Sequence, residues 1–285
     1  MNDTLVLGAV AYDPKVVTIW EGFKEYFAKR GLAFDYVLYS NYESQVEAML
    51  RGDCAIAWNS PLAWIRARRM AQSRGLTLRA LAMRDTDCDL SSVIIVRKDS
   101  AIGSVGDLAG MTVGVGAIDS PQATLIPLQF LSAKGLEPGL DYKVRRFDVL
   151  AGKHGDHIGG ERDAARALEK GEVAAACMID GNHLLFIREG TLSAGQTKVL
   201  AQTDRYDHCN FTVAPGVDEG QVCRFLELLL AMSYADPEVR PLLDLEGLKM
   251  WKKGRVEGYV MLEAAVDHFN FYDVAGNVTS PDYRY

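Results

Sequence analysis

One ten-residue stretch, residues 153–162, concentrates side chains that can bind a metal ion or a polar solute. It holds two histidines, an aspartate, a glutamate and three glycines, and a helix is expected to follow it. Imidazole and carboxylate groups are common ligands of Zn²⁺ and of non-haem iron. His154, His157 and Glu161 therefore form a candidate metal set. The His-x-x-His spacing is not diagnostic outside a helix, so a loop that hydrogen-bonds a solute, or an ordinary polar loop, stays open.

A second concentration of reactive types lies at residues 204–210, where His208 and Cys209 are adjacent. A Cys/His pair can supply a thiolate nucleophile or two metal ligands. Neighbouring residues of a strand point to opposite faces, so in a strand these two side chains could not face one ligand. The sequence favours a connecting segment here.

A glycine pattern at 114–119 has Asp119 in place of the third glycine, which argues against dinucleotide binding.

Length and charge narrow the class of protein. The chain has 285 residues, 31 basic and 38 acidic, for a net charge of −7. An acidic balance argues against a general nucleic-acid binder. The longest largely apolar stretch, residues 225–232, is far shorter than the roughly 20 residues of a membrane span. Five cysteines without a Cys-x-x-Cys pair are typical of reduced thiols and favour the cytoplasm.

The first residues carry no signal-peptide pattern. Met1-Asn2-Asp3-Thr4 leads at once into an apolar, strand-like run. The sequence therefore predicts a cytoplasmic protein, or a periplasmic one whose signal peptide has been removed.

Apolar strands alternate with amphipathic helices along the first half of the chain, which predicts an α/β fold with mixed, mostly parallel sheets. The predicted strands are Leu5–Val10, Phe34–Tyr39, Cys54–Trp58, Leu76–Met83, Ser92–Arg97 and Met111–Val115. The predicted helices are Val16–Phe27, Glu43–Arg51, Pro61–Gln72, Gln122–Lys134, Glu219–Ala235 and Val256–Phe271.

An internal echo indicates two similar lobes. Residues 47–59 and 166–180 both read as a helix end, a glycine, an acidic residue and a small apolar strand that ends in polar residues. We expect one lobe to hold residues 1–88 and 205–285, and the other to hold 92–202. The crossings near 87–91 and 203–210 would form a hinge, with a ligand between the lobes, because open α/β sheets bind ligands at the carboxyl ends of their strands.

Several of these segments resemble a known family. They are Tyr42 with Val46–Met49, Gly52-Asp53 with Ala55–Trp58, Ser60–Trp64, Ser92–Ser100, Asp107–Gly114, Asp119–Gln122, and Asp163-Ala164 through Gly171 to Asp180. Together they are similar to the phosphonate/phosphite/phosphate solute-binding proteins of ABC importers over about residues 5–240. The resemblance implies a type II periplasmic-binding-protein fold, in which two lobes close on a small anion or zwitterion. It also implies an ABC permease as partner, a monomer, and no cofactor.

The resemblance carries over candidate ligand-binding residues. They are Tyr42, Ser60, Ser120, Gln122, His157, Arg162 and Asp180. Two departures bear on the ligand. The family's Asp-Ser-Thr-Ser-Gly loop reads Asp-Ser-Pro-Gln-Ala from Asp119 here, and Glu161-Arg162 replaces the family's Ser-His. We expect Arg162 to supply bidentate charge in place of that histidine. The anion could be phosphonate-like, phosphate-like or a carboxylate.

Two rival hypotheses remain open at this stage. One is a cytoplasmic enzyme on the same fold, dependent on Fe or Zn bound by the 154–161 loop and similar in fold to the iron-dependent pyrimidine-precursor synthases of thiamine biosynthesis. The Cys-rich motif of those synthases is absent here. The other is a cytoplasmic sensor that signals ligand binding to a partner through lobe closure.

Overall fold

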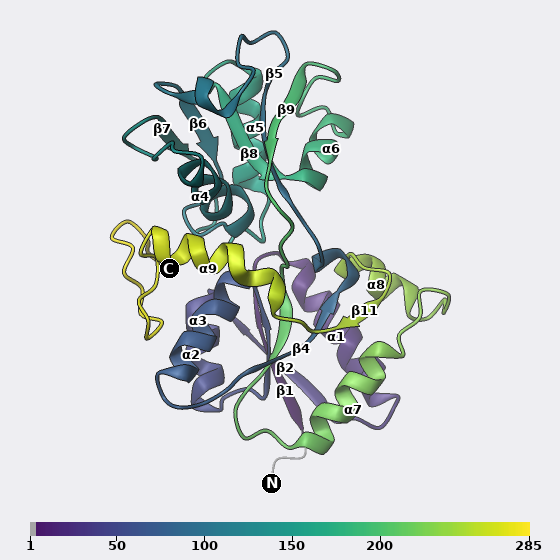
Figure 1. Cartoon of the computed structure of the whole chain (residues 1–285). Helices are drawn as coiled ribbons and strands as arrows, with labels where there is room; N and C mark the ends of the chain where they lie inside the picture. The colour runs from purple at the N-terminus through teal and green to yellow at the C-terminus, as the bar shows by residue number, and fades with distance from the viewer. Residues whose placement is uncertain (1–3) are drawn as a thin grey trace.

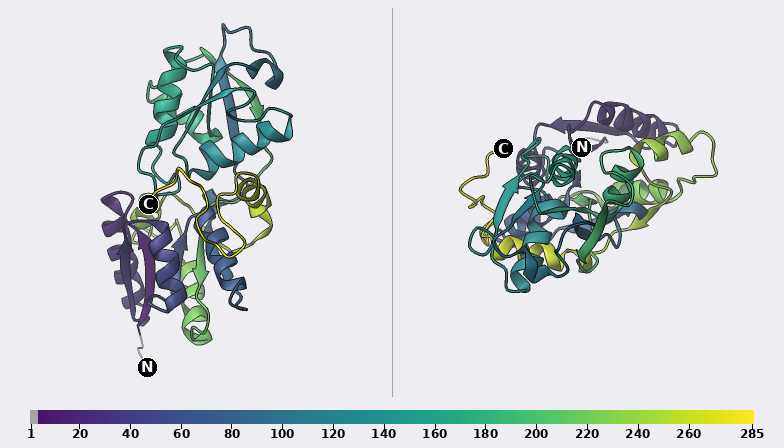
Figure 2. Two further views of the ribbon diagram at one scale, coloured as in Figure 1. Left: turned by 90° about the vertical axis from the view of Figure 1, so that its left-hand side faces the viewer. Right: turned by 90° about the horizontal axis from the view of Figure 1, so that it is seen from above.

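The computed structural model describes residues 4–285 and shows two α/β lobes stacked end to end (Figure 1). Met1, Asn2 and Asp3, on which the prediction of a leaderless start rests, lie outside the described residues. Each lobe is built on its own sheet, and helices cover the faces of both sheets (Figure 2). Two lobes of the periplasmic-binding-protein kind were predicted, and the α/β class is confirmed.

The first lobe contains a six-stranded sheet in the order β11-β4-β10-β3-β1-β2. Its strands are β1 (Leu5–Val10), β2 (Phe34–Tyr39), β3 (Ile56–Asn59), β4 (Arg79–Arg84), β10 (Asn210–Val213) and β11 (Trp251–Lys253). Its helices are α1 (Lys15–Ala28), α2 (Tyr42–Arg51), α3 (Pro61–Gln72), α7 (Glu219–Leu230) and α8 (Arg240–Glu246).

The second lobe contains a five-stranded sheet in the order β7-β6-β8-β5-β9. Its strands are β5 (Ser92–Arg97), β6 (Thr112–Val115), β7 (Lys143–Arg146), β8 (Ala175–Ile179) and β9 (Thr197–Gln202). Its helices are α4 (Ile126–Ala133), α5 (Gly159–Glu169) and α6 (Asp180–Arg188). A short π-turn, Pro121–Leu125, precedes α4, so the helix predicted from Gln122 begins irregularly.

The sheets are mixed, as predicted, and each combines parallel with antiparallel pairs. β1 pairs in parallel with β2 and β3, and β6 pairs in parallel with β7 and β8. β10 and β5 each lie antiparallel to both of their neighbours, and β11 is antiparallel to β4. β5 and β10 are the strands that follow the two crossings between the lobes, and each enters its sheet against the direction of its neighbours.

Local sequence explains why the elements begin and end where they do. Ser60 caps α3 by accepting a hydrogen bond from the Ala63 amide, and Pro61 occupies the first helical turn. Gly52 ends α2 in the left-handed conformation, with φ 88°. Gly171, with φ 72°, has the same conformation in the turn between α5 and β8, so the internal echo corresponds to two equivalent helix–glycine–strand units.

Two segments cross between the lobes side by side. Residues 85–91 join β4 to β5, residues 203–209 join β9 to β10, and Leu90 and Tyr206 form an antiparallel bridge between them. Helix α9 (Val260–His268) lies between the lobes and continues into the C-terminal segment (Figures 1 and 2). The helix predicted over Val256–Phe271 is therefore shorter, with a 3₁₀ turn (Glu257–Tyr259) before it.

Among residues 4–285, no helix combines the length and the apolar character needed to cross a membrane.

Candidate functional site

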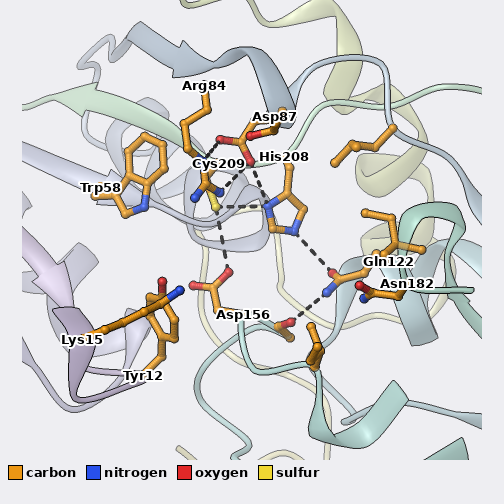
Figure 3. A pocket seen from close by; sticks show the side chains of 15 residues that line it. Tyr12, Lys15, Trp58, Arg84, Asp87, Gln122, Asp156, Asn182, His208 and Cys209 are labelled. Carbon is orange, nitrogen blue, oxygen red and sulfur yellow. Dashed lines mark hydrogen bonds and ion pairs between the residues drawn. The ribbon is translucent and has the colours of Figure 1, made fainter. Parts of the chain in front are cut away.

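A polar cavity of about 260 Å³ lies between the two lobes, next to both crossings (Figure 3). Its walls are formed by Tyr12, Lys15, Trp58, Arg84, Thr86, Asp87, Leu90, Gln122, Gly155, Asp156, Ile158, Ile179, Asn182, His208 and Cys209. Residues of the first lobe, the second lobe and both crossings contribute to it. A change in the angle between the lobes would therefore change its shape.

Sheet geometry brings the first-lobe residues together. β1, β3 and β4 run in the same direction, because β10 is antiparallel to both β3 and β4. Tyr12 follows β1, Trp58 lies near the end of β3, and Arg84 ends β4, so all three lie at the carboxyl edge of one sheet. The Arg84 guanidinium also lies 5.1 Å from the Trp58 ring centre.

Arg84 is the centre of a buried charged cluster with Asp87 and Glu246. It donates to Asp87 from Nε (2.5 Å) and Nη2 (2.9 Å), and to Glu246 Oε1 from Nη1 (3.3 Å). Burial would raise the pKa of Asp87, but Arg84 and a hydrogen bond with His208 outweigh burial and lower that pKa to about 2. Burial raises the pKa of Glu246 to about 7, because Arg84 offsets it only partly and Asp87 repels a second negative charge.

His208 and Cys209 both face the cavity, which corrects the expectation that adjacent residues would point apart. The regular strand β10 begins only at Asn210, so the alternation of a strand does not apply to the two residues before it. His208 Nδ1 lies 3.1 Å from Cys209 Sγ and 3.4 Å from Asp87 Oδ1. His208 Nε2 lies 3.4 Å from Gln122 Oε1.

The loop of residues 153–158 forms the second-lobe wall of the cavity. Gln122 Nε2 donates to the Gly155 carbonyl at 2.8 Å, and the partly buried Asp156 carboxylate accepts a hydrogen bond from the Tyr42 hydroxyl. Burial raises the pKa of Asp156, with partial offset from His208 and Tyr42. Only glycine fits at 155, where φ is +76° and a Cβ would lie 2.4 Å from Ser120 Oγ.

The same loop forms a second buried cluster against the first lobe, which we call the interlobe latch: Glu43, Ser60, His154, Tyr272 and Tyr283. His154 is fully buried and contacts Ser60 Oγ through Nδ1 (2.6 Å) and Glu43 Oε1 through Nε2 (3.0 Å). The hydroxyls of Tyr272 and Tyr283 each donate to Glu43 Oε1 at 2.9 Å. Burial would raise the pKa of Glu43, but these partners outweigh it and lower the pKa.

Two of the residues predicted to bind the ligand, Tyr42 and Ser60, instead contact His154 of the interlobe latch. Tyr42 stacks on the His154 ring, with ring centres 4.8 Å apart, and Ser60 binds His154 directly. Ser120 is buried and caps the turn before α4, accepting from the Ala123 amide at 3.2 Å. Of the predicted ligand-binding residues, Gln122 alone lines the cavity among residues 4–285.

His157, Arg162 and Asp180 have other partners. His157 Nδ1 accepts from the Gly159 amide at 3.1 Å, and Asp180 Oδ2 accepts from Ser91 Oγ at 3.0 Å. The Arg162 guanidinium binds Glu189 on α6, with Nε 2.7 Å from Oε1, and none of the three lines the cavity as described.

The predicted metal set does not converge in the described part of the chain. Both nitrogens of His154 contact the latch, and Glu161 Oε2 accepts from the Asn182 side chain at 2.7 Å. Within residues 4–285, Asp87, His208 and Cys209 are the one group of His, Cys, Asp or Glu residues whose ligand atoms all lie within 4.8 Å of one another.

Substitution of Arg162 by alanine is expected to leave solute affinity within about twofold of wild type. Its guanidinium is engaged by Glu189 on an exposed face, where an ion pair contributes only about 0–1 kcal/mol. Isothermal titration with any solute that binds the chain measures the change. A loss of tenfold or more would place Arg162 in the binding site after all.

Sequence reasoning did not single out Tyr12, Lys15, Arg84, Asp87 and Asn182 as site residues. A usable signal existed for two of them, because Tyr12 and Arg84 follow predicted strands at the edge where α/β sheets bind ligands. Asp156 was noted only as part of the polar loop, and His208-Cys209 only as a connection.

A comparison with protein-family models matches residues 9–259 to the family described as ABC transporter, phosphonate, periplasmic substrate-binding protein. No curated protein matches the chain. Three solved structures show the same fold. PhnD1 from Prochlorococcus marinus (MIT 9301), in complex with methylphosphonate, is 18% identical with a TM-score of 0.69, and the match covers 94% of this chain and 98% of that one.

The descriptions of the other two structures name a phosphonate transporter and a sulphonate binding protein. A binding-protein component of an ABC phosphonate transporter from Pseudomonas aeruginosa is 16% identical, with a TM-score of 0.64 and coverage of 96% and 89%. The periplasmic aliphatic sulphonate binding protein SsuA from Escherichia coli is 17% identical, with a TM-score of 0.57 and coverage of 94% and 84%. At these identities the likeness establishes the fold.

Proposed function

The chain belongs to the periplasmic, phosphonate-type substrate-binding family of ABC transporters, and from this premise we propose that the cavity between its lobes binds one small oxyanion-bearing solute, anionic or zwitterionic. The observation that carries the proposal is that both lobes and both crossings contribute walls to the same polar cavity. A solute bound there favours the closed arrangement over an open one, because only the closed arrangement offers all the contacts.

The charges around the cavity fit such a solute. Lys15 lines the cavity, and its ammonium group lies 5.8 Å from the centre of the Tyr12 ring, where it can bind an oxyanion. The amides of Gln122 and Asn182 add hydrogen-bonding groups from the second lobe. Asp156, on the facing loop, gives a zwitterion a place for its cationic group when the carboxyl is ionised.

The family supplies the partner and the compartment. Its members are periplasmic proteins of ABC transporters, so we propose delivery of the solute to an ABC permease from the periplasm. The comparisons give no support to the cytoplasmic alternative. That the chain acts as a monomer remains a prediction.

Substitution of Lys15 by alanine is expected to weaken binding of the preferred solute roughly tenfold, since a hydrogen bond to a charged group contributes about 1.5–3 kcal/mol and Lys15 is exposed, which favours the lower end. Isothermal titration against methylphosphonate, an alkanesulfonate, inorganic phosphate, an aminoalkylphosphonate and a dicarboxylate identifies that solute. Lys24→Ala is the matched control, because Lys24 lies on the same helix but pairs with Asp35 at 2.9 Å.

Two results would contradict the proposal. Equal losses of affinity in the Lys15 and Lys24 variants would show that Lys15 does not bind the solute. If no solute of the panel binds, the proposal that the cavity binds an oxyanion-bearing solute is wrong. Mass spectrometry of the released solute completes the experiment, because a chemically altered solute would favour the enzyme hypothesis over solute binding.

A further inference from the structure

Asp87, His208 and Cys209 bring a carboxylate, an imidazole and a thiol together at the edge of the cavity, and the proposed solute binding assigns no role to this group. We propose that these three residues, with Asp156 as the fourth ligand, form a binding site for a divalent transition-metal ion of the Zn²⁺ type at the edge of the interlobe cavity (Figure 3). The three residues are all buried and come from the two crossing segments.

The hydrogen bonds around Gln122 fix which nitrogen of His208 is available. The Gln122 amide nitrogen donates to the Gly155 carbonyl, so its oxygen is the atom that faces His208 Nε2. An amide oxygen only accepts, so a neutral imidazole here carries its proton on Nε2 and a lone pair on Nδ1. A hydrogen bond from the far nitrogen of this kind is how proteins orient a metal-binding histidine.

The Nδ1 lone pair then meets a second acceptor. Asp87 Oδ1 lies 3.4 Å from Nδ1, and a carboxylate oxygen has no hydrogen to donate. Cys209 Sγ also lies close to Nδ1, at a distance of 3.1 Å. In the absence of a metal, the thiol proton of Cys209 can serve the Nδ1 lone pair, and Arg84 balances the charge of Asp87. A metal ion that replaces the thiol proton would bind Nδ1, Sγ and the Asp87 carboxylate together.

The distances around His208 are close to those of a tetrahedral ion, and the ligand atoms of the three residues all lie within 4.8 Å of one another. With Zn–S of about 2.3 Å and Zn–N and Zn–O of about 2.0–2.2 Å, neighbouring ligand atoms lie roughly 3.4–3.6 Å apart. The Asp87–His208 separation of 3.4 Å matches, and the His208–Cys209 separation of 3.1 Å needs only a small movement. Asp156 Oδ1, 3.9 Å from Cys209 Sγ, can complete the set or yield its place to a water or a solute oxygen.

The donor types select the ion. One imidazole, one thiolate and one or two carboxylates are ligands of Zn²⁺ and similar ions, whereas Mg²⁺ and Ca²⁺ prefer all-oxygen sites. Arg84 donates to both oxygens of Asp87 and holds that carboxylate in place. Metal binding would release the thiol proton of Cys209 to solvent, because the thiolate is the ligand.

The test is a titration of the reduced, metal-free full-length chain with Co²⁺, without any solute, followed by displacement with Zn²⁺. We expect one equivalent to bind and a thiolate-to-cobalt charge-transfer band to appear and then vanish with Zn²⁺. Cys209→Ser should abolish the band, and His208→Gln should weaken Co²⁺ binding by roughly 100-fold. Gln122→Ala removes the positioning hydrogen bond and should weaken it roughly 10–100-fold.

The matched control is Cys88→Ser, because Cys88 lies in the first crossing and its thiol donates to the Arg84 carbonyl. That variant should keep the band. No band in the wild-type chain, or a band that survives Cys209→Ser, would overturn the proposal and assign the Nδ1–Sγ contact to a hydrogen bond from the Cys209 thiol. Circular dichroism checks that each variant is folded. Since no solute is present, failure here leaves the oxyanion proposal standing, and failure of the solute panel leaves the metal site standing.

Discussion

Replacement of His154 by alanine is expected to lower the free energy of unfolding by about 3–5 kcal/mol, the usual cost of removing one partner of a buried pair. The change leaves the Glu43 carboxylate fully buried with only two tyrosine hydroxyls, and leaves Ser60 without its 2.6 Å partner. Because His154 belongs to the second lobe and Glu43 to the first, the variant should also open the cleft. Urea unfolding measures the first effect, and the radius of gyration in small-angle X-ray scattering measures the second.

The chain offers a matched control for that variant. His268 and Glu137 form a second histidine–glutamate pair at 3.2 Å, but both side chains are about 40% exposed, at 36% and 44%. Substitution of His268 by alanine should cost no more than about 1 kcal/mol. Equal losses in the two variants, or an unchanged radius of gyration for His154→Ala, would show that the interlobe latch does not hold the lobes together.

In the wild type, ionisation of Glu246 is expected to lower the free energy of unfolding by about 3 kcal/mol between pH 4.5 and pH 8, and Glu246→Gln should remove this decrease. Burial raises the pKa of Glu246 from 4.5 to about 7, so the folded protein binds a proton that the unfolded chain releases. Its contribution is present below pH 4.5 and is lost as the pH rises to about 7. A difference of 2.5 pKa units corresponds to roughly 3 kcal/mol at 1.36 kcal/mol per unit.

Urea unfolding at pH 4.5, 6, 7 and 8 tests this. The wild type and Glu246→Gln should be similarly stable at pH 4.5, and the variant should be the more stable at pH 8, because glutamine stays neutral beside Arg84. The exposed Glu238, in the turn that precedes the same helix, provides the control as Glu238→Gln, which should follow the wild type. Parallel pH curves for Glu246→Gln and the wild type would show that the buried carboxyl stays ionised.

The order of elements in the first half of the chain could be predicted because local signals were strong. The strands at Leu5–Val10, Phe34–Tyr39 and Ser92–Arg97 and the helix at Pro61–Gln72 have the predicted bounds. β7, β9, β10, β11 and α8 were not predicted, and several of them are short or lack a continuous apolar run. The direction of β5 and β10 in their sheets could not follow from periodicity, since a strand has the same pattern in either direction.

The candidate site was predicted less completely. Gln122 lines the cavity, whereas Tyr42 and Ser60 contact the loop that forms its wall and belong to the surroundings of the interlobe latch. Arg162 lies in the first turn of α5, but its guanidinium forms an ion pair with Glu189 on α6 and does not line the cavity. A helix pattern identifies the buried face, and it does not identify which neighbour an exposed charge meets.

By itself, the sequence determined the α/β class and the two-lobe plan, because hydrophobic periodicity, capping residues and glycine stops act within a few residues of the chain. The family was indicated by the resemblance of particular segments, and the family-model match then showed it. Only the tertiary structure decided that Arg84, Asp87 and His208 meet in one cavity with Gln122. These residues are separated by up to 124 positions, 208 minus 84, and they meet because two chain crossings lie side by side. Contacts of that range depend on how whole sheets pack, which no local pattern encodes.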